Sequence, residues 1–389
     1  MKKSQFLSGL VPKPPDWKID WIKIENSALS PWIAKMKGVP QNPLWHGEGD
    51  VWIHTMMVCE ELTAMSDWRM LDRKKREELF MAALLHDIGK IPCTRMENGA
   101  WISPNHSIVG SRMAREILWL EFGFCGEPNM LNFRETVCTL IRYHSVPIHI
   151  LEREEPERCA AKMASVGRLA GDFSLRMLWI LSSADMRGRI CGDKKEVLEA
   201  VDLFRLLAEE SDCLEMPLIF PDSWSEYAYL SGKNILPGQK LFDDSRGEVI
   251  LMSGLPGTGK DTWIKTYADG YAEISLDKIR QRMHISPRDN QTAVVNDARE
   301  QAKAYLRKQI PFVWNATNLT LMTREKQIRL FTDYHASVRI VYLETEWEEQ
   351  MRRNTGRQDA VPEAVIRNML RKMSLPERFE AHEVQWICV

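Results

Sequence analysis

Imidazole and carboxylate groups recur in the first half of this sequence at positions where a helix would turn them inward. Six of the nine histidines lie between His46 and His149. His54 and His144 each fall on an apolar stripe with helical spacing, and Asp185 falls on a third stripe. Side chains of these types bind divalent cations when several of them converge. The pattern therefore indicates metal chemistry, provided that the helices meet.

A fourth predicted helix, about residues 77–88, ends in the adjacent pair His86-Asp87, and Gly89 and Pro92 terminate it. One inward histidine is most often a hydrogen-bonded core residue. Four helices that aim imidazoles or carboxylates inward are harder to explain in this way, because a buried carboxylate without a partner is costly. A divalent cation removes that cost. The predicted ligands are His54, His86, Asp87 and Asp185, and His46 is predicted to be a loop histidine near them.

A glycine-rich turn in the second half fits the phosphate-binding pattern G-x-x-x-x-G-K. It follows the apolar run 249–252 and precedes a predicted helix. Its glycines let backbone N–H groups close around phosphates, and Lys260 should reach the β- and γ-phosphates. We predict a site for ATP or another nucleoside triphosphate with Mg²⁺, formed by Gly254, Gly257, Thr258, Gly259, Lys260, Asp261 and Thr262.

Asp261 occupies the position at which this pattern has a Mg²⁺-binding serine or threonine. A carboxylate beside phosphates is unfavourable unless it engages the metal. Either Asp261 binds Mg²⁺, directly or through water, or the neighbouring Thr262 takes that role. The sequence leaves both interpretations open.

Two further groups of charged residues follow the glycine-rich turn. Asp277 and Arg280 come after the predicted strand 272–275, where an N-capping aspartate with a surface arginine is the alternative to a catalytic role. Arg353 and Arg357 flank an internal Thr-Gly. That dipeptide favours a mobile lid over a solvated basic helix end.

These residues require two kinds of architecture to position them. Helical periodicity dominates residues 50–207, whereas short apolar strands alternate with helices after Gly247, which predicts a parallel sheet with crossover helices. The strand candidates are residues 249–252, 272–275, 312–314 and 338–343. The predicted organisation is an N-terminal extension (1–43), an all-α bundle (44–210), a Pro- and Gly-containing connector (211–246) and an α/β P-loop domain (247–389) with a lid near 350–360.

Composition limits the classes of function. A chain of 389 residues is too long for one core, and its net charge of −2 argues against a protein that coats long nucleic acids. Recognition of a few phosphates near an end remains compatible with that charge. No apolar run is long enough to cross a membrane, and the eight cysteines form no CxxC pair. We therefore expect a cytoplasmic protein.

The order His54, His86-Asp87, Asp185 resembles the HD phosphohydrolase superfamily over about residues 44–189. The resemblance implies an HD-domain bundle in which these four residues bind a catalytic metal. His106 and His144 fall where binuclear members bind a second ion. One or two divalent ions, such as the transition metal Mn²⁺, are therefore expected.

Lys90 matches a lysine of the same superfamily motif, in His-Asp-Ile-Gly-Lys. The resemblance implies that it contacts substrate phosphate. The alternative is an ordinary cation at a helix end.

The P-loop with Asp277 and Arg280 resembles the phage-type 5′-OH polynucleotide kinases. The resemblance implies that Asp277 accepts the proton of the attacking hydroxyl, that Arg280 contacts phosphates, and that Arg353 and Arg357 are lid arginines that balance phosphoryl charge. The segment 315–318 matches the Asp-Thr-Asn region of these kinases, except that Ala316 replaces the aspartate, and Arg324 follows as in the family pattern.

An HD domain followed by such a kinase is similar to the bacterial HD–polynucleotide kinase family over nearly the whole chain. The resemblance implies an enzyme that heals RNA or DNA ends. Its HD domain would remove 2′,3′-cyclic phosphate and 2′-phosphate, its kinase domain would phosphorylate 5′-OH ends, and a polynucleotide ligase would act in the same pathway. Two alternatives stay open: an HD nucleotidase fused to a small-metabolite or nucleoside kinase, and a non-catalytic nucleotide sensor.

Overall fold

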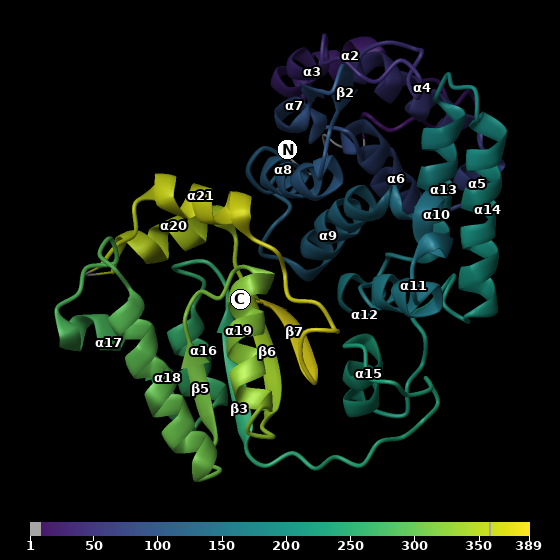
Figure 1. Cartoon of the computed structure of the whole chain (residues 1–389). Coiled ribbons are helices and arrows are strands. Elements are labelled where there is room, and N and C mark those ends of the chain that lie inside the picture. Colours follow the sequence, from purple (N-terminus) through teal and green to yellow (C-terminus); the bar gives the residue numbers. More distant parts are fainter. Residues whose placement is uncertain (1–8, 358) are drawn as a thin grey trace. The chain divides into compact units, whose positions relative to one another are not determined.

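The computed structural model describes residues 9–357 and 359–389, which divide into two compact units. The first unit contains the residues up to Cys125 and Asn129–Leu218, and the second contains Gly126–Pro128 and Ile219–Val389 (Figure 1). Residues 1–8 of the predicted extension and position 358 of the predicted lid lie outside the described residues. Among the described residues, no helix combines the length and the apolar character needed to cross a membrane.

The first unit consists of helices and one short antiparallel hairpin (Figure 1). Its elements are α2 (Trp21–Glu25), α3 (Ser30–Met36), α4 (Val51–Ala64), α5 (Ser66–Arg69), α6 (Arg73–Leu85), α7 (Lys90–Cys93), β1 (Arg95–Glu97), β2 (Ala100–Ile102), α8 (His106–Leu120), α9 (Pro128–Tyr143), α10 (Val146–His149), η1 (Ile150–Glu152), α11 (Pro156–Ala164), α12 (Gly167–Ala170), α13 (Leu175–Arg187) and α14 (Lys194–Glu210). The helical region was predicted, and the hairpin was not.

Polar side chains fix where the central helices of this unit begin. The carboxylate of Asp50 accepts a hydrogen bond from the Ile53 backbone N–H at the start of α4, and Asp72 caps α6 in the same way. The hydroxyl of Ser174 caps α13. Such caps satisfy backbone donors that a helix leaves unpaired. They set the phase in which each helix presents its apolar face to the core.

Two glycines allow the helices to approach closely. A Cβ atom at Gly188 would lie 2.8 Å from the backbone nitrogen of Val58, so α13 passes directly against α4. A Cβ atom at Gly89 would lie 2.0 Å from the carbonyl oxygen of His106, so α8 starts against the turn after α6. Any larger side chain at either position would separate these elements.

The second unit is built around a five-stranded parallel sheet with the order β4-β5-β3-β6-β7 (Figure 1). Its elements are α15 (Ser223–Leu230), β3 (Glu248–Ser253), α16 (Lys260–Tyr267), β4 (Ala272–Ser275), α17 (Leu276–Met283), α18 (Thr292–Arg307), β5 (Phe312–Asn315), α19 (Leu321–Thr332), β6 (Ser337–Glu344), α20 (Trp347–Thr355), α21 (Glu363–Lys372) and β7 (Glu383–Cys388). The predicted α/β architecture is confirmed, and the four predicted strands are β3 to β6.

Alternate residues of the strands pack against helices on the two faces of the sheet. On one face, Val313 joins the core that Trp263 of α16 covers. On the other face, the ring centroids of Phe312 and Trp314 lie 5.5 and 5.7 Å from the ring centroid of Phe331 of α19. A parallel sheet covered in this way places the carboxyl ends of its strands at one edge.

The segment predicted as a connector contains the helix α15. The indole of Trp224 stacks on the imidazole of His382 at 4.3 Å between ring centroids, and Glu226 forms an ion pair with Arg378. Both partners belong to the second unit. The helix is therefore part of that unit's packing.

Candidate functional site

The six predicted metal ligands come together inside the first unit. They are His54 on α4, His86 and Asp87 after α6, His106 at the start of α8, His144 after α9, and Asp185 on α13. All are buried except His106, whose side chain is 20% exposed. The histidine that is most open to solvent therefore marks the accessible side of the cluster.

Asp87 lies between two pairs of histidines. Its Oδ2 is 3.3 Å from Nε2 of His86 and 3.7 Å from Nε2 of His54, whereas its Oδ1 is 3.4 Å from Nε2 of His106 and 3.9 Å from Nε2 of His144. The two oxygens of one carboxylate thus face two different pairs. If cations were bound, each pair of histidines would therefore have one oxygen of this carboxylate beside it.

Asp185 belongs to the first of these pairs. Its Oδ1 lies 3.0 Å from Nε2 of His54 and 3.9 Å from Nε2 of His86. The close approach of α13 to α4 at Gly188 brings this carboxylate to His54 across 131 positions of sequence.

The hydrogen bonds of three histidines leave their Nε2 atoms as ligands. Nδ1 of His86, His106 and His144 lies 2.7 to 2.8 Å from a backbone oxygen, of Ala83, Ser103 and Ile141 respectively. Because a carbonyl oxygen can only accept, these rings carry their proton on Nδ1 and the lone pair on Nε2. His54 lies between two carboxylates: its Nε2 is hydrogen-bonded to Oδ1 of Asp185 at 3.0 Å, and its Nδ1 lies 2.8 Å from Oε1 of Glu48 without hydrogen-bond geometry.

The Nε2 atoms of the histidines face one another at short distances. The Nε2 atoms of His54 and His86 lie 3.3 Å apart, and those of His106 and His144 lie 3.4 Å apart. Oδ1 of Asp87 is buried without a hydrogen-bond donor. Imidazole nitrogens and carboxylate oxygens so arranged fit one or two divalent cations, which these groups bind in proteins.

The charges in the cluster support the same conclusion. Burial opposes a positive charge on His86, but Asp87 and Asp185 outweigh that effect and raise its pKa. Burial, with His86 and His106, lowers the pKa of His144 to about 3, so this ring is neutral and able to bind a metal. Asp87 and Asp185 thus favour positive charge around His86, whereas His144 stays neutral.

Two cations lie directly against the predicted ligands. Lys90 Nζ is 2.7 Å from Oδ2 of Asp87 and donates to Oε1 of Gln41 at 2.7 Å. Arg189 Nη2 is 2.8 Å from Oδ2 of Asp185. Lys90 is buried, which differs from the alternative of a solvated cation at a helix end. Its contact with phosphate stays a prediction.

Three residues of this region had no role in the sequence-based prediction: Gln41, Glu48 and Arg189. Arg189 follows Asp185 by one helical turn, and this spacing could have revealed the ion pair. His46, placed near the site by prediction, lies against His54 with 4.7 Å between ring centroids. Gln41 gave no signal in the sequence.

The glycine-rich turn forms the second site, between β3 and α16. Gly254, Gly257 and Gly259 have φ values of +144°, +84° and +89°, which favour glycine. A Cβ atom at Gly254 would lie 2.6 Å from the carbonyl oxygen of Leu343. The turn can therefore close only with glycine at these positions. Thr258 stabilises it through a hydrogen bond from its hydroxyl to the carbonyl oxygen of Leu255.

Lys260 points back over the turn that precedes it. Its Nζ donates to the carbonyl oxygens of Gly254 and Leu255 at 2.9 and 2.8 Å. Burial lowers the pKa of its ammonium group to about 8, and Asp261 and Asp277 partly oppose this effect. An anionic phosphate in the turn would stabilise the protonated lysine.

Three predicted residues meet beside this lysine. Arg280 Nη2 lies 2.6 Å from Oδ1 of Asp277, and Arg357 Nη2 lies 3.5 Å from Oδ2 of the same carboxylate. Asp277 and Arg357 both act electrostatically on Lys260. The side chain that caps α17 is Ser275, so Asp277 is not the N-cap residue that was the structural alternative.

Arg353 lies over the glycine-rich turn from α20. A Cβ atom at Gly259 would be 3.4 Å from Nη1 of Arg353. Nε of this arginine is 2.7 Å from a carboxylate oxygen of Glu349. Hydrogen bonds from Arg352 and Arg353 lower the pKa of Glu349 to about 2.

Asp261 takes part in a polar cluster at the carboxyl edge of the sheet. Asn315, which ends β5, donates from Nδ2 to Oδ1 of Asp261 at 2.7 Å and to Oε1 of Glu273 at 2.8 Å. One oxygen of Asp261 thus stays available for a cation, and Thr262 is exposed next to it. Carboxylate oxygen suits Mg²⁺, so the site fits this ion with either residue as ligand.

Arg324, which follows the segment 315–318 as in the family pattern, has a structural role. It is fully buried and donates from Nε and Nη2 to the two carboxylate oxygens of Glu380 at 2.6 and 2.9 Å. It also donates to backbone oxygens of Asn318, Ser374 and Leu375. These contacts use the guanidinium in the interior, so Arg324 stabilises the fold.

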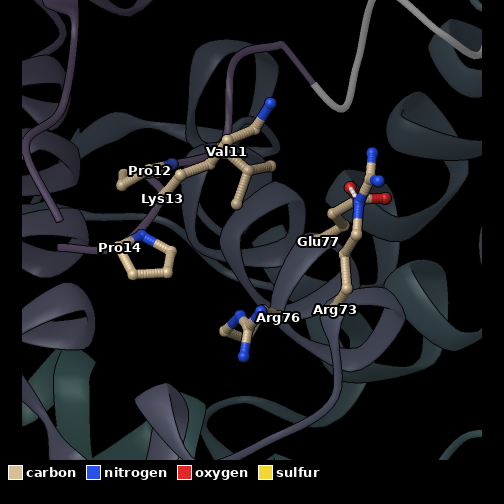
Figure 2. A pocket seen from close by; sticks show the side chains of 7 residues that line it. All are labelled: Val11, Pro12, Lys13, Pro14, Arg73, Arg76 and Glu77. Atoms are coloured by element: carbon tan, nitrogen blue, oxygen red, sulfur yellow. Dashed lines mark hydrogen bonds and ion pairs between the residues drawn. The ribbon is translucent and has the colours of Figure 1, made fainter.

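A pocket of about 350 Å³ in the first unit lies apart from the ligand cluster (Figure 2). It opens at the start of α6, whereas His86 follows the end of that helix. Figure 2 shows the residues that line it, which are Val11, Pro12, Lys13, Pro14, Arg73, Arg76 and Glu77. None of these lining residues is a predicted site residue. Arg73 forms an ion pair with Glu77, so part of the charge in this pocket is neutralised.

Comparison with known families gives a match within each unit of the chain. Residues 50–167 match the HD domain family, and residues 249–376 match a family described as AAA domain. Five of the six predicted metal ligands fall within the first match, and Asp185 lies beyond it.

Curated relatives match over short stretches. The Multifunctional CCA protein of Shewanella frigidimarina (strain NCIMB 400) is 40% identical over 62 residues, which is 16% of this chain and 13% of that protein. The protein of the same name from Hahella chejuensis (strain KCTC 2396) is 38% identical over 90 residues, which is 23% of this chain and 19% of that protein. The chain thus spans less than a fifth of the length of these two relatives. The family matches support a chain in which a helical HD hydrolase domain is followed by an α/β P-loop domain of kinase-like type.

Proposed function

We propose that this chain heals broken nucleic-acid ends. In this proposal the HD domain hydrolyses 2′,3′-cyclic phosphate and 2′-phosphate ends. The P-loop domain transfers the γ-phosphoryl group of ATP to 5′-hydroxyl ends of RNA or DNA. The repaired ends would be substrates for a polynucleotide ligase.

The observation that carries the proposal is the position of Asp277. Its carboxylate is held by Arg280 and Arg357 beside Lys260, yet its side chain remains 60% exposed. A carboxylate so placed can accept the proton of an alcohol while the neighbouring cations hold phosphate. Its exposure suits the end of a polymer better than a small metabolite that must be enclosed.

In the kinase step, each charged group has a separate task. Asp277 orients the 5′-hydroxyl and accepts its proton. Lys260 and the arginines at positions 280, 353 and 357 balance the charge on the phosphoryl group during in-line transfer. Loss of the Asp277 carboxylate should therefore reduce transfer much more than ATP binding.

In the hydrolytic step, the residues of the HD domain would hold a cation and keep its carboxylate ligands ionised. When bound, a divalent cation would lower the pKa of water and balance the charge of a phosphoryl oxygen. The four histidines and the carboxylates of Asp87 and Asp185 would hold it. Burial opposes ionisation of those two carboxylates, but Lys90 and Arg189 keep them ionised, because each lowers the pKa of its partner.

The proposal is tested with an oligonucleotide that carries a 5′-hydroxyl and a 2′,3′-cyclic phosphate, incubated with labelled ATP and a divalent metal. We expect labelled phosphate at the 5′ end and loss of phosphate from the other end. Free nucleosides and nucleotides serve as competing substrates. Preferred phosphorylation of free nucleosides would favour the nucleoside-kinase alternative, and a protein that changes neither end would contradict the proposal.

A further inference from the structure

Glu48 lies outside the predicted ligand set, yet its carboxylate makes several contacts behind the metal centre. Oε1 is 2.8 Å from Nδ1 of His54 and 2.8 Å from Nδ1 of His46. Oε2 accepts a hydrogen bond from the backbone N–H of Ile190 at 2.8 Å. The side chain is 1% exposed. His46 and Ile190 are hydrogen-bonded to this buried carboxylate, and His54 lies against it.

We infer that Glu48 is a positioning residue that holds the orientation of His54 for metal binding. The inference rests on the metal centre of the proposed function, but it does not depend on which phosphoester is hydrolysed. It adds a residue that does not bind the metal itself but orients one of the ligands, His54.

His54 differs from the other three histidines in what holds its Nδ1. Backbone carbonyl oxygens hold the Nδ1 atoms of His86, His106 and His144, and no substitution of a side chain removes those acceptors. The group that faces Nδ1 of His54 is a side chain, the carboxylate of Glu48. The position of this ring is therefore the one that a side-chain substitution can change.

The contact places the carboxylate of Glu48 on the side of the His54 ring that is turned away from the other ligands. Nε2 faces Asp185 at 3.0 Å and His86 at 3.3 Å. If these groups bind a cation, Nε2 supplies its lone pair, and the ring proton is then on Nδ1, toward Glu48. A carboxylate behind a histidine also makes the ring a more basic ligand.

The same carboxylate joins two segments that carry ligands. The Gly47 N–H donates to the Ile190 carbonyl oxygen at 2.8 Å, and the Ile190 N–H donates to Glu48 in return. Ile190 follows Arg189, which holds Asp185. Glu48 thereby ties the loop before α4 to the segment after α13, and it aligns His54 with Asp185.

A competing interpretation is that Glu48 is itself a metal ligand. One ligand atom each from His46, Glu48 and His54 can lie within 4.8 Å of one another. A cation among them would take Nδ1 of His54 while Nε2 faces the main cluster. The ring would then lose both its protons, which is unfavourable compared with the two hydrogen bonds that the carboxylate already accepts. The metal stoichiometry separates the two interpretations.

The test compares Glu48→Gln with Glu61→Gln, a matched control on α4. Both changes remove one negative charge and preserve side-chain length, but Glu61 forms no hydrogen bond or ion pair with a histidine in the described part of the chain. The amide that Glu48→Gln introduces would bring an NH₂ group against the N–H donors of His54, His46 or Ile190. Metal affinity is measured by competition with a chromogenic chelator, metal content by elemental analysis, and ligand geometry by the visible spectrum of the Co²⁺-loaded protein.

We expect Glu48→Gln to bind the same number of ions at saturation, with an affinity lower by about 10–100-fold and a changed Co²⁺ spectrum. Glu48→Asp, which keeps the charge, should recover part of the affinity and stands in if the glutamine variant does not fold. His46→Ala should keep the full metal content, because the contact between Glu48 and His54 remains.

Equal affinities and spectra for Glu48→Gln and Glu61→Gln would overturn the inference. Loss of one metal ion in both Glu48→Gln and His46→Ala would also overturn it, in favour of a third ion. Because none of these measurements uses a phosphoester, their outcome is separate from that of the proposed function. A protein that shows the expected metal dependence but leaves 2′-phosphorylated oligonucleotides intact would contradict only the proposed hydrolysis.

Discussion

At the scale of single residues, burial sets the charge of the side chain that should meet ATP. The ammonium group of Lys260 hydrogen-bonds to two backbone carbonyl oxygens of its own turn. Burial lowers its pKa to about 8. The free protein near pH 8 thus holds a mixture of protonated and neutral Lys260, whereas bound phosphates favour the protonated form.

ATP affinity should therefore fall as the pH rises above about 8. Below that pH the lysine is protonated with or without ATP, and above it binding requires the uptake of a proton. The dissociation constant should increase by up to about tenfold per pH unit, and about half a proton should be taken up at pH 8. Calorimetry at pH 7, 8 and 9, in buffers of different ionisation enthalpy, measures both quantities. Lys260→Arg should give a flat profile because arginine stays charged. A constant affinity of the native protein from pH 7 to 9 would show that Lys260 does not titrate in this way.

Glu78 is a buried carboxyl group in the core of the first unit. Burial raises its pKa, whereas it lowers the pKa of Lys260. Neither of its oxygens has a hydrogen-bond partner. Burial raises its pKa well above the ordinary value, and the nearby Asp172 adds to this effect. Its carboxyl group is therefore protonated in the folded protein over a pH range in which the unfolded chain has lost that proton.

Glu78→Gln should stabilise the first unit at pH 8 by about 0.5–2 kcal/mol, and by less at pH 5. The sign follows from proton binding. Above the ordinary glutamate pKa only the folded state keeps this proton, so the native protein loses stability as the pH rises. Urea unfolding at the two pH values gives the difference, with the exposed Glu157→Gln as control. A stability change that is independent of pH would mean that Glu78 ionises normally.

The sequence predicts the ligand residues better than it predicts their partners. His54, His86, Asp87, His144 and Asp185 stand out because helical spacing turns polar groups toward apolar faces. The partners Glu48 and Asn315 lie in a loop and at a strand end, where no periodicity fixes the direction of a side chain. Asn315 meets Asp261 only because β5 lies beside β3 in the sheet, and the sheet order is not written in local sequence.

At the scale of elements, the metal centre depends on close contact between helices. Gly89 stands where the turn after α6 meets α8, and a Cβ atom there would lie 2.0 Å from the carbonyl oxygen of His106. This distance is far below van der Waals contact. The first residue of α8 could not stay in place with any other residue at position 89.

Gly89→Ala should displace His106 and weaken the His106–His144 side of the metal centre. Overpacking of this kind destabilises a protein by about 1–3 kcal/mol. The matched control is Gly192→Ala, since a Cβ atom at Gly192 would meet nothing within 4 Å. Elemental analysis should show that the Gly89 variant retains fewer ions than the control, and thermal unfolding should occur at lower temperature. Equal metal content and equal stability of the two variants would contradict the packing described here.

The strands were predictable to the degree that they are apolar. The runs that became β3, β5 and β6 are almost wholly buried, as expected for central strands of a parallel sheet. β7 (Glu383–Cys388) has only one buried residue and lies at the edge of the sheet, so its sequence carries no comparable signal. The hairpin of β1 and β2 turns at Asn98-Gly99, a turn signal that could have predicted it.

At the scale of the whole molecule, each unit contains one of the two candidate sites. All six predicted metal ligands belong to the first unit, and the glycine-rich turn, Asp277, Arg353 and Arg357 belong to the second. The net charge of −2 argues against a general positive surface for long nucleic acid. Recognition should therefore depend on a few local cations at each site.

The central claim, that the chain has two independent phosphate-handling sites, is tested most directly by two substitutions on one substrate. Asp87→Ala and Lys260→Ala are each incubated with the oligonucleotide that carries a 5′-hydroxyl and a 2′,3′-cyclic phosphate. Asp87→Ala should lose phosphate release and keep 5′ phosphorylation near the native rate, because the ligand that faces both histidine pairs is gone. Lys260→Ala should show the reverse. If either substitution abolishes both reactions while the protein stays folded, the two sites are not independent and the account is wrong.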